Sequence, residues 1–374
     1  MPLLRISIAL AVCLTLQAAP KPNKRAKNVI VFLADAGGIP TVNAASLLGY
    51  GEPQKLFVQS WPHIGLSDTS PALAYVTDSA AGMTAIVTGR KTHNGVISMD
   101  ASTVRGKSDG AVLKTVLEYA EERGLSTGVV SNVSIADATP AACYGHSNDR
   151  AKQAGIYLQI FSPRFGDGVD IVIGGGRKKI YGDVTAMGKN LDDVAAQYKR
   201  PIYSKLAEVP AANARPLVLL DDAADVPDMA KAALDRLSKN RKGYFLMIEW
   251  DAHTDNPERG LNNVVNFDKL IRELASKVDL RDTLLLFTAD HSFELRTVGG
   301  RRGEPLLKGF DEWQKTHQPR EAVAIPALRV GRSHTGEEVL AAAIGPGAEK
   351  VKGFFPNTHL FDVIMSAYGW KPSK

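Results

Sequence analysis

The sequence of 374 residues predicts an α/β fold, a doubly wound, mostly parallel central sheet with helices on both faces. Three observations predict this fold. Apolar runs of strand length alternate along the chain with helical patterns. Most of these runs are apolar at every position, as in strands buried on both faces of a parallel sheet. Several runs end in polar residues, and ligands of open α/β sheets bind beyond the carboxyl ends of the strands.

Six apolar segments bounded by turn residues predict strands, in chain order, at 28–34, 126–131, 170–173, 216–220, 244–248 and 283–288. Apolar residues at helical spacing predict helices at 111–123, 229–240, 261–278 and 358–368. Parallel strands need long crossover connections, and a helix is the usual one. The alternation therefore indicates one sheet with helices packed against it.

The segment 74–89 predicts a short strand at 75–77, a tight turn and a helix. Small residues follow Ser79 as far as Gly89, which can end the helix. The unpaired N–H groups and the dipole at a helix start favour an anion, so the Ser79 hydroxyl would be held near a phosphate. Taken alone, the segment is explained more simply by an ordinary serine N-cap.

Carboxylates and imidazoles gather at the expected strand ends. They are, in chain order, Asp35, Glu249, Asp251, His253, Asp290 and His291. Alternate residues of an extended segment share a face, so the three around 251 can point into one site. So much negative charge at one edge is tolerable only if metal ions neutralise it. Carboxylate oxygens and imidazole nitrogens are ligands that suit zinc.

Two further residues fit such a site. His334 lies among small residues late in the chain, and Arg150 follows Asn148 and Asp149. Arginine suits bidentate binding of phosphate. Read singly, His334 is a surface histidine and Arg150 a solvated charge.

The N-terminus predicts export. Arg5 precedes an apolar run at 6–16 and small residues near a plausible cleavage point, which predicts a signal peptide at 1–19 and a linker at 20–27. The mature chain would keep one cysteine, Cys143, so no disulfide within the chain is expected. The net charge of +5 suits an anionic substrate, but it suits nucleic acid or a membrane surface equally well.

The motifs together resemble the alkaline phosphatase family. VTDSAAGMTAIVTGRKTHNG is similar to its nucleophile segment, and the other matches follow in the family's order: NVIVFLADAGG, DATPAACYGHSNDR, DIVIGGGRK, FTADH and SHTGEEV. The resemblance runs from residue 28 to the C-terminus, which predicts a single domain at 28–374. One motif would be weak evidence, but the ordered set is specific.

The resemblance implies roles for individual residues. Ser79 would be the nucleophile that becomes phosphorylated, Arg150 would bind the phosphate, and Asp78 would orient Arg150. The first of two zinc ions would be held by Asp35, Asp290 and His291. The second would be held by Asp251, His253 and His334. A magnesium ion would be held by Asp35, Thr139 and Glu249, with Asp137 nearby.

The segment 249–253 departs from the family pattern, because its acidic residues and histidine are more closely spaced. Glu249 is therefore an uncertain magnesium ligand, and Asp255 is a substitute candidate. The shorter turn also lacks a basic side chain that often contacts phosphate in the family. The stretch between Arg150 and Tyr244 is shorter than usual, so reduced peripheral or dimer-contact elements are expected.

The predicted function is hydrolysis of small phosphate monoesters by an exported enzyme, periplasmic or extracellular, through a phosphoserine. The alternatives are a phosphodiesterase or sulfatase of the same metallo-superfamily, and a non-catalytic phosphate-binding relative. No nucleic acid partner and no membrane span are expected, and a homodimer is left open.

Overall fold

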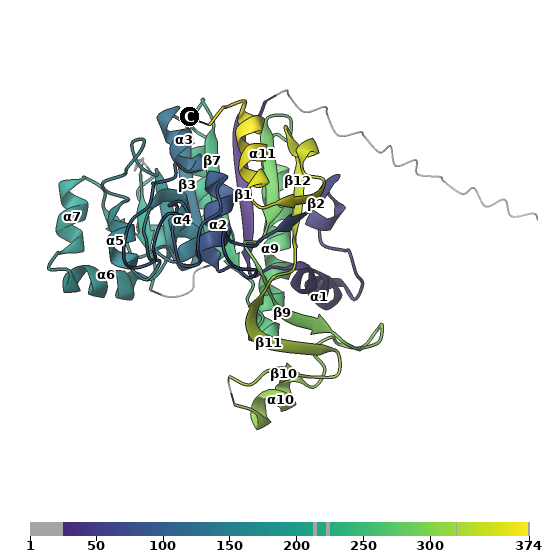
Figure 1. Ribbon diagram of the computed structural model, residues 1–374. Helices are drawn as coiled ribbons and strands as arrows, with labels where there is room; N and C mark the ends of the chain where they lie inside the picture. Colours follow the sequence, from purple (N-terminus) through teal and green to yellow (C-terminus); the bar gives the residue numbers. More distant parts are fainter. Residues whose placement is uncertain (1–24, 212–214, 222–224, 319, 373–374) are drawn as a thin grey trace, which may run out of the picture.

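The computed structural model describes residues 25–211, 215–221, 225–318 and 320–372 (Figure 1). The predicted signal peptide and most of the predicted linker lie outside the described residues. The strands are β1 (Asn28–Asp35), β2 (His63–Asp68), β3 (Ser126–Ser134), β4 (Ile171–Gly175), β5 (Ile202–Tyr203), β6 (Leu217–Leu219), β7 (Tyr244–Asp251), β8 (Thr283–Thr288), β9 (Ser292–Thr297), β10 (Val323–Ala324), β11 (Leu328–Thr335), β12 (Val339–Ile344) and β13 (Gly353–Pro356).

The α-helices are α1 (Ile39–Tyr50), α2 (Ser79–Thr88), α3 (Val116–Glu122), α4 (Ala138–Tyr144), α5 (Gln153–Leu158), α6 (Arg177–Ala186), α7 (Leu191–Gln197), α8 (Val226–Leu237), α9 (Pro257–Lys277), α10 (Phe310–Thr316) and α11 (His359–Tyr368). Three short 3-10 helices are η1 (Val58–Ser60), η2 (Leu206–Glu208) and η3 (Ala348–Lys350). Among the described residues, no helix has both the length and the apolar character needed to cross a membrane.

Ten strands form the central sheet, in the order β13-β2-β12-β8-β1-β7-β3-β4-β6-β5. Every pairing is parallel except the two made by β12, which runs antiparallel to β2 and to β8. The expected doubly wound, mostly parallel sheet is confirmed. All six expected strands are present, and β7 continues to Asp251, beyond the expected end at 248.

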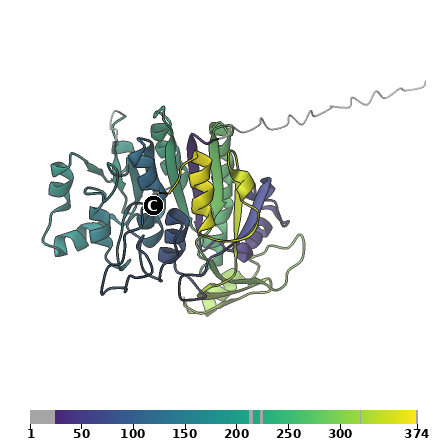
Figure 2. The ribbon, with the colours of Figure 1, turned by 45° about the horizontal axis from the view of Figure 1, so that its top comes forward.

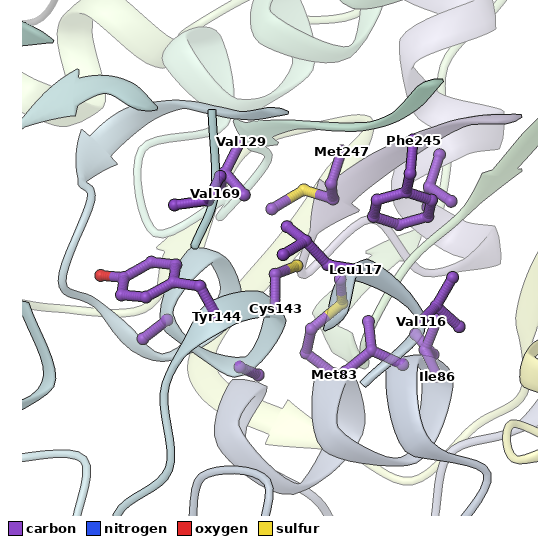
Figure 3. Close-up of a cluster of buried hydrophobic side chains, with 14 of the residues drawn as sticks. Met83, Ile86, Val116, Leu117, Val129, Cys143, Tyr144, Val169, Phe245 and Met247 are labelled. Atoms are coloured by element: carbon purple, nitrogen blue, oxygen red, sulfur yellow. The ribbon is translucent and has the colours of Figure 1, made fainter. Parts of the chain in front are cut away.

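Helices cover both faces of this sheet. Along β1, Val29, Val31 and Leu33 pack into one apolar cluster with α2, α3, α4 and α11, whereas Ile30 and Phe32 pack into another with α1, α8 and α9. Figure 3 shows part of the first cluster, where side chains of α2, α3 and α4 meet those of β3 and β7. This two-sided burial is the reason that the strand segments are apolar at every position.

A second sheet of three strands, β10-β11-β9, lies apart from the central sheet together with α10 (Figures 1 and 2). The chain enters it directly from the end of β8 and returns from β11 to β12. The sequence patterns did not predict this sheet, because its strands are short or partly exposed.

The expected strand at 75–77 is wrong. These residues lie in an irregular loop in which Tyr75 is 92% exposed, and none of the described strands pairs with them. The expected helix at 111–123 begins only at Val116, because Thr115 caps it in a reciprocal hydrogen-bond pair with Glu118.

Glu121, near the end of α3, is a buried acid away from the strand ends. Its carboxylate accepts hydrogen bonds from the Gly168 backbone N–H at 3.0 Å and from the Thr127 hydroxyl at 3.3 Å. Burial is the main cause that raises the pKa of Glu121 to about 8, and the neighbouring charge of Glu118 adds to it.

We predict that Glu121→Gln makes folding stability less dependent on pH. The folded protein keeps its proton up to about pH 8, whereas an unfolded chain releases it near 4.5. The folded state therefore binds more protons between these values, and wild-type stability falls as pH rises from about 5 to 8. With each pKa unit worth about 1.4 kcal/mol, we expect a loss on the order of a few kcal/mol relative to the variant.

Urea unfolding at pH 5 and pH 8 checks this prediction, with Glu122→Gln on the same helix as the control. Equal pH dependence in wild type and Glu121→Gln would contradict it.

Candidate active site

The ends of three neighbouring strands bring the acidic residues together. β1 lies between β8 and β7, and its register places Asp35 opposite Asp251. Asp290 follows the end of β8 by two residues. Because parallel strands end at the same edge, carboxylates far apart in sequence meet there.

The first group of side chains is Asp35, Asp290 and His291, and all three are buried. One potential ligand atom from each lies within 4.8 Å of the other two. The His291 Nε2 is 3.3 Å from Asp35 Oδ1 and 3.7 Å from Asp290 Oδ2. These are the residue types that bind zinc.

The second group is His253, His291 and His334, whose ligand atoms also lie within 4.8 Å of one another. His334 is on β11, paired in register with Phe293 of β9, so the small sheet carries it to the strand ends. Its ring stacks on that of His291, with centroids 3.8 Å apart. His334 therefore lies in a strand, and its side chain faces the other two histidines.

Hydrogen bonds to carbonyl groups fix two of the imidazoles. His291 Nδ1 lies 3.1 Å from the Ser292 carbonyl oxygen, and His334 Nδ1 lies 3.0 Å from the Thr77 carbonyl oxygen. A carbonyl only accepts, so each Nδ1 carries the proton and donates it. When either ring is neutral, its Nε2 carries the lone pair that can bind a metal.

The carboxylates and imidazoles of the cluster perturb one another. Burial and the charge of Asp35 raise the pKa of Asp290 to about 6. Burial lowers the pKa of His291, but Asp290 and Asp35 outweigh it and raise that pKa to about 9. Burial and the charge of His291 lower the pKa of His334 to about 4. The pKa values of these three groups therefore depart strongly from their ordinary values, as is common at functional sites.

Glu249 is fully buried beside this cluster. Its Oε2 accepts a hydrogen bond from the Ser131 hydroxyl, while Oε1 has no hydrogen-bond partner among the described residues. Burial and the charge of Asp35 raise the pKa of Glu249 well above its ordinary value. Thr139 lies close by, its hydroxyl donating to Asp290 Oδ2 at 3.3 Å. A buried carboxylate oxygen without a donor, next to further carboxylates and a hydroxyl, fits a hard cation.

Ser79 is the first residue of α2, and the N-cap is Asp78. The Asp78 carboxylate accepts from the Ala81 backbone N–H at 3.1 Å, so the alternative that Ser79 is an ordinary N-cap is wrong. The Ser79 side chain is free of that role, and its Oγ lies 3.2 Å from His291 Nε2. The hydroxyl therefore lies next to His291, a member of the first group of side chains.

Arg150 is held between two carboxylates. Its Nη1 donates to Asp78 Oδ2 at 3.1 Å and its Nη2 to Asp137 Oδ1 at 3.0 Å. The same Asp78 therefore caps α2 and fixes the guanidinium of Arg150. The structure brings Ser79 and Arg150 together through this residue.

Asp251, the last residue of β7, and Asp255, four residues later, have different surroundings. Asp251 Oδ1 lies 2.7 Å from His253 Nδ1 and belongs to neither group above. Asp255 lies outside the cluster and pairs with Arg259 at 2.7 Å and with Arg332 at 3.7 Å. Glu249 is therefore the acidic residue that lies near Asp35, whereas Asp255 is paired with arginines outside the cluster.

Sequence reasoning missed Ser131, which positions Glu249, and Arg259, whose guanidinium lies 3.7 Å from Asp251 Oδ2. Ser131 is the last residue of the expected strand at 126–131, and in the sheet it lies opposite Glu249 of the neighbouring strand β7. Its place at a strand end was the feature of the sequence that could have indicated it. Arg259 stands in the first turn of α9, and its spacing from Asp255 by four residues is a usual one for helix ion pairs.

A family model described as alkaline phosphatase matches residues 26–204 and 220–318. The human tissue-nonspecific alkaline phosphatase is 30% identical over 442 residues, covering 91% of this chain and 83% of the relative. The Escherichia coli alkaline phosphatase is 28% identical, covering 93% of this chain and 87% of the relative.

Solved structures share the fold. The alkaline phosphatase of the Antarctic bacterium TAB5 superposes with a TM-score of 0.75 at 23% identity, covering 94% of this chain and all of that one. The Thermus thermophilus alkaline phosphatase gives 0.76 at 22% identity, covering 97% and 96%. A variant of the TAB5 enzyme was solved with magnesium bound in its M3 site.

We predict that Glu249→Gln reduces metal-dependent stability. A neutral amide resembles the protonated acid in the metal-free protein but is a poorer ligand for a hard cation. A chelator should therefore lower the melting temperature of wild type more than that of the variant. Metal analysis should show fewer ions bound by Glu249→Gln. Asp255→Asn is the matched control and should behave as wild type; the reverse pattern would make Asp255 the ligand.

Proposed function

Because the chain belongs to the alkaline phosphatase family and is thus a phosphatase, we propose that it hydrolyses phosphate monoesters through a phosphoserine on Ser79. The observation that carries this proposal is the position of Ser79 Oγ, 3.2 Å from His291 Nε2 in a buried group of metal-binding residue types. An attacking oxygen at a helix start, beside a fixed arginine, is suitably placed to meet a phosphate.

We further propose two zinc ions and one magnesium ion. The residues for the first zinc are Asp35, Asp290 and His291. Those on the side of the second zinc are Asp251, His253 and His334. Those for magnesium are Asp35, Thr139 and Glu249. The fit is supported by the unpaired Glu249 Oε1 and by the available Nε2 atoms of the histidines. Bound metal ions supply the positive charge that stabilises the attacking and leaving oxygens of phosphoryl transfer.

The protein's own groups would act in two displacements. Ser79 Oγ forms a bond to phosphorus while the bond from phosphorus to the ester oxygen breaks, and the alcohol leaves. Water then attacks the phosphoserine, which releases inorganic phosphate and restores Ser79. Arg150 would bind two phosphate oxygens through its two terminal nitrogens, which Asp78 and Asp137 hold in place.

The export and domain expectations belong to the same proposal. Residues 1–19 would direct the chain to the periplasm or the exterior and be removed, and 28–374 would act as one domain after the linker. Arg5 and the apolar run at 6–16 support this.

We predict that Ser79→Ala abolishes turnover of p-nitrophenyl phosphate, because alanine has no hydroxyl group to accept the phosphoryl group. An acid quench during turnover should leave one phosphoryl group on wild type, found by mass spectrometry of the peptide containing Ser79. Ser276→Ala is the control, near the far end of the 21-residue helix α9. Full activity of Ser79→Ala would contradict the mechanism, and faster cleavage of a matched diester would favour the phosphodiesterase alternative.

We predict that Arg150→Ala lowers kcat/KM for p-nitrophenyl phosphate and weakens inhibition by inorganic phosphate. Hydrogen bonds to charged groups are worth about 1.5–3 kcal/mol, so a loss of roughly tenfold to hundredfold is expected. Steady-state kinetics measure both effects. Arg281→Ala is the matched control, since Arg281 pairs with Asp279 at 2.6 Å just before β8, at the opposite edge of the sheet. An unchanged kcat/KM in Arg150→Ala would remove Arg150 from the phosphate site.

A further inference from the structure

The loop that leads into α2 is held by few packing contacts. Residues 73–76 are all exposed, and Tyr75 is 92% exposed. Asp78 and Ser79 follow directly, and the Asp78 carboxylate holds Arg150. Segments with few buried contacts open easily. The precise position of Asp78 and Ser79 therefore depends on hydrogen bonds rather than on burial of the loop before them.

Asn94, in the segment that follows α2, makes two such hydrogen bonds. Its Nδ2 donates to the Val76 carbonyl oxygen at 3.0 Å, and its Oδ1 accepts from the Asp78 backbone N–H at 3.1 Å. Only one orientation of the amide satisfies both contacts, because a carbonyl only accepts and a backbone N–H only donates. One side chain therefore joins the backbone on both sides of Thr77 and fixes it just before Ser79.

Two further contacts bring the same two segments together. Lys91 Nζ donates to the Ser70 hydroxyl at 2.9 Å, and the Ala72 backbone N–H donates to the Thr92 carbonyl oxygen at 2.9 Å. Along the loop, these contacts lie farther from Ser79 than those of Asn94. Asn94 is therefore the residue of this segment that acts closest to the site.

Asp78 connects this constraint to the phosphate site. Its carboxylate accepts from the Ala81 backbone N–H at 3.1 Å and from Arg150 Nη1 at 3.1 Å. Asn94 holds the backbone that carries this carboxylate. A shift of that backbone would move the carboxylate and with it the guanidinium, and small displacements of substrate-positioning groups are costly to catalysis.

We propose that Asn94 is a positioning residue, which holds Asp78 and through it sets the orientation of Arg150 toward phosphate. The inference rests on the proposed function and adds to it a residue that acts on phosphate binding from the segment after α2. Its measurable consequence is that the effect of Asn94 on phosphate binding depends on the presence of Arg150.

The test is a double-mutant cycle on the metal-loaded enzyme, with wild type, Asn94→Ala, Arg150→Ala and the double variant. Isothermal titration calorimetry measures the Kd of inorganic phosphate, and steady-state kinetics measure kcat and KM for p-nitrophenyl phosphate. Asn94→Ala should raise the Kd and the KM by roughly fivefold, the worth of about one hydrogen bond. In the Arg150→Ala background, the same substitution should change either value by less than about twofold.

Asn240→Ala is the matched control. Asn240 holds a turn in a similar way, since its Oδ1 accepts from the Lys242 backbone N–H at 2.9 Å and its Nδ2 donates to the Gly124 carbonyl oxygen at 3.0 Å. It lies near the starts of β3 and β7, at the opposite edge of the sheet from the site. This variant should bind phosphate as wild type does. Near-ultraviolet circular dichroism checks that each variant is folded.

Two results would overturn the inference. A variant that is only destabilised has fewer active molecules, so the measured kcat and the bound stoichiometry fall while KM and Kd stay unchanged. That pattern in Asn94→Ala would reduce Asn94 to a structural role. An equal loss with and without Arg150 would show that Asn94 acts through another contact of the loop, such as that of Thr77 with His334.

Failure of the proposed function is seen separately. Phosphate binding is measured without turnover, so the cycle on Kd reports on Asn94 and Arg150 alone. The phosphoserine mechanism fails instead when wild type binds inorganic phosphate but shows no turnover that depends on Ser79.

Discussion

The concentration of carboxylates at one edge of the sheet is the constraint on which the rest of the site depends. β1, β7 and β8 are neighbours and parallel, so Asp35, Glu249 and Asp290 are buried near one another. Water cannot solvate them there, and the charge of Asp35 raises the pKa of both Glu249 and Asp290. A fold that keeps such an edge needs positive charge from elsewhere. The imidazoles and the cations that this residue set fits would supply it.

The elements around this edge hold those charges in fixed orientations. Backbone carbonyls orient His291 and His334, and Asp251 orients His253. Asp78 fixes two elements in the same way, since its carboxylate both caps α2 and accepts a hydrogen bond from Arg150. Hydrogen bonds between protein groups therefore fix the orientations of these side chains.

The sequence was sufficient for the parallel part of the sheet, because strands buried on both faces leave a continuous apolar signal. It also brought out the residues at the strand ends. It was insufficient where structure depends on distant partners. The apolar 75–77 run has no neighbouring strand, and β9 and β11 are stabilised by each other rather than by a local pattern. The hydrogen bonds of Asp78 with the Ala81 backbone and of Asp251 with His253 depend on side-chain orientation, which the spacing of residues in the sequence does not determine.

The contact between His334 Nδ1 and the Thr77 carbonyl joins segments separated by 257 positions in the chain. Contacts of such long range form slowly, because the intervening chain must first be ordered. His334 can make this contact only after β11 has paired with β9 and the small sheet has met the loop that precedes α2. We therefore expect the site to be completed late in folding, after the helix that begins at Ser79 has formed.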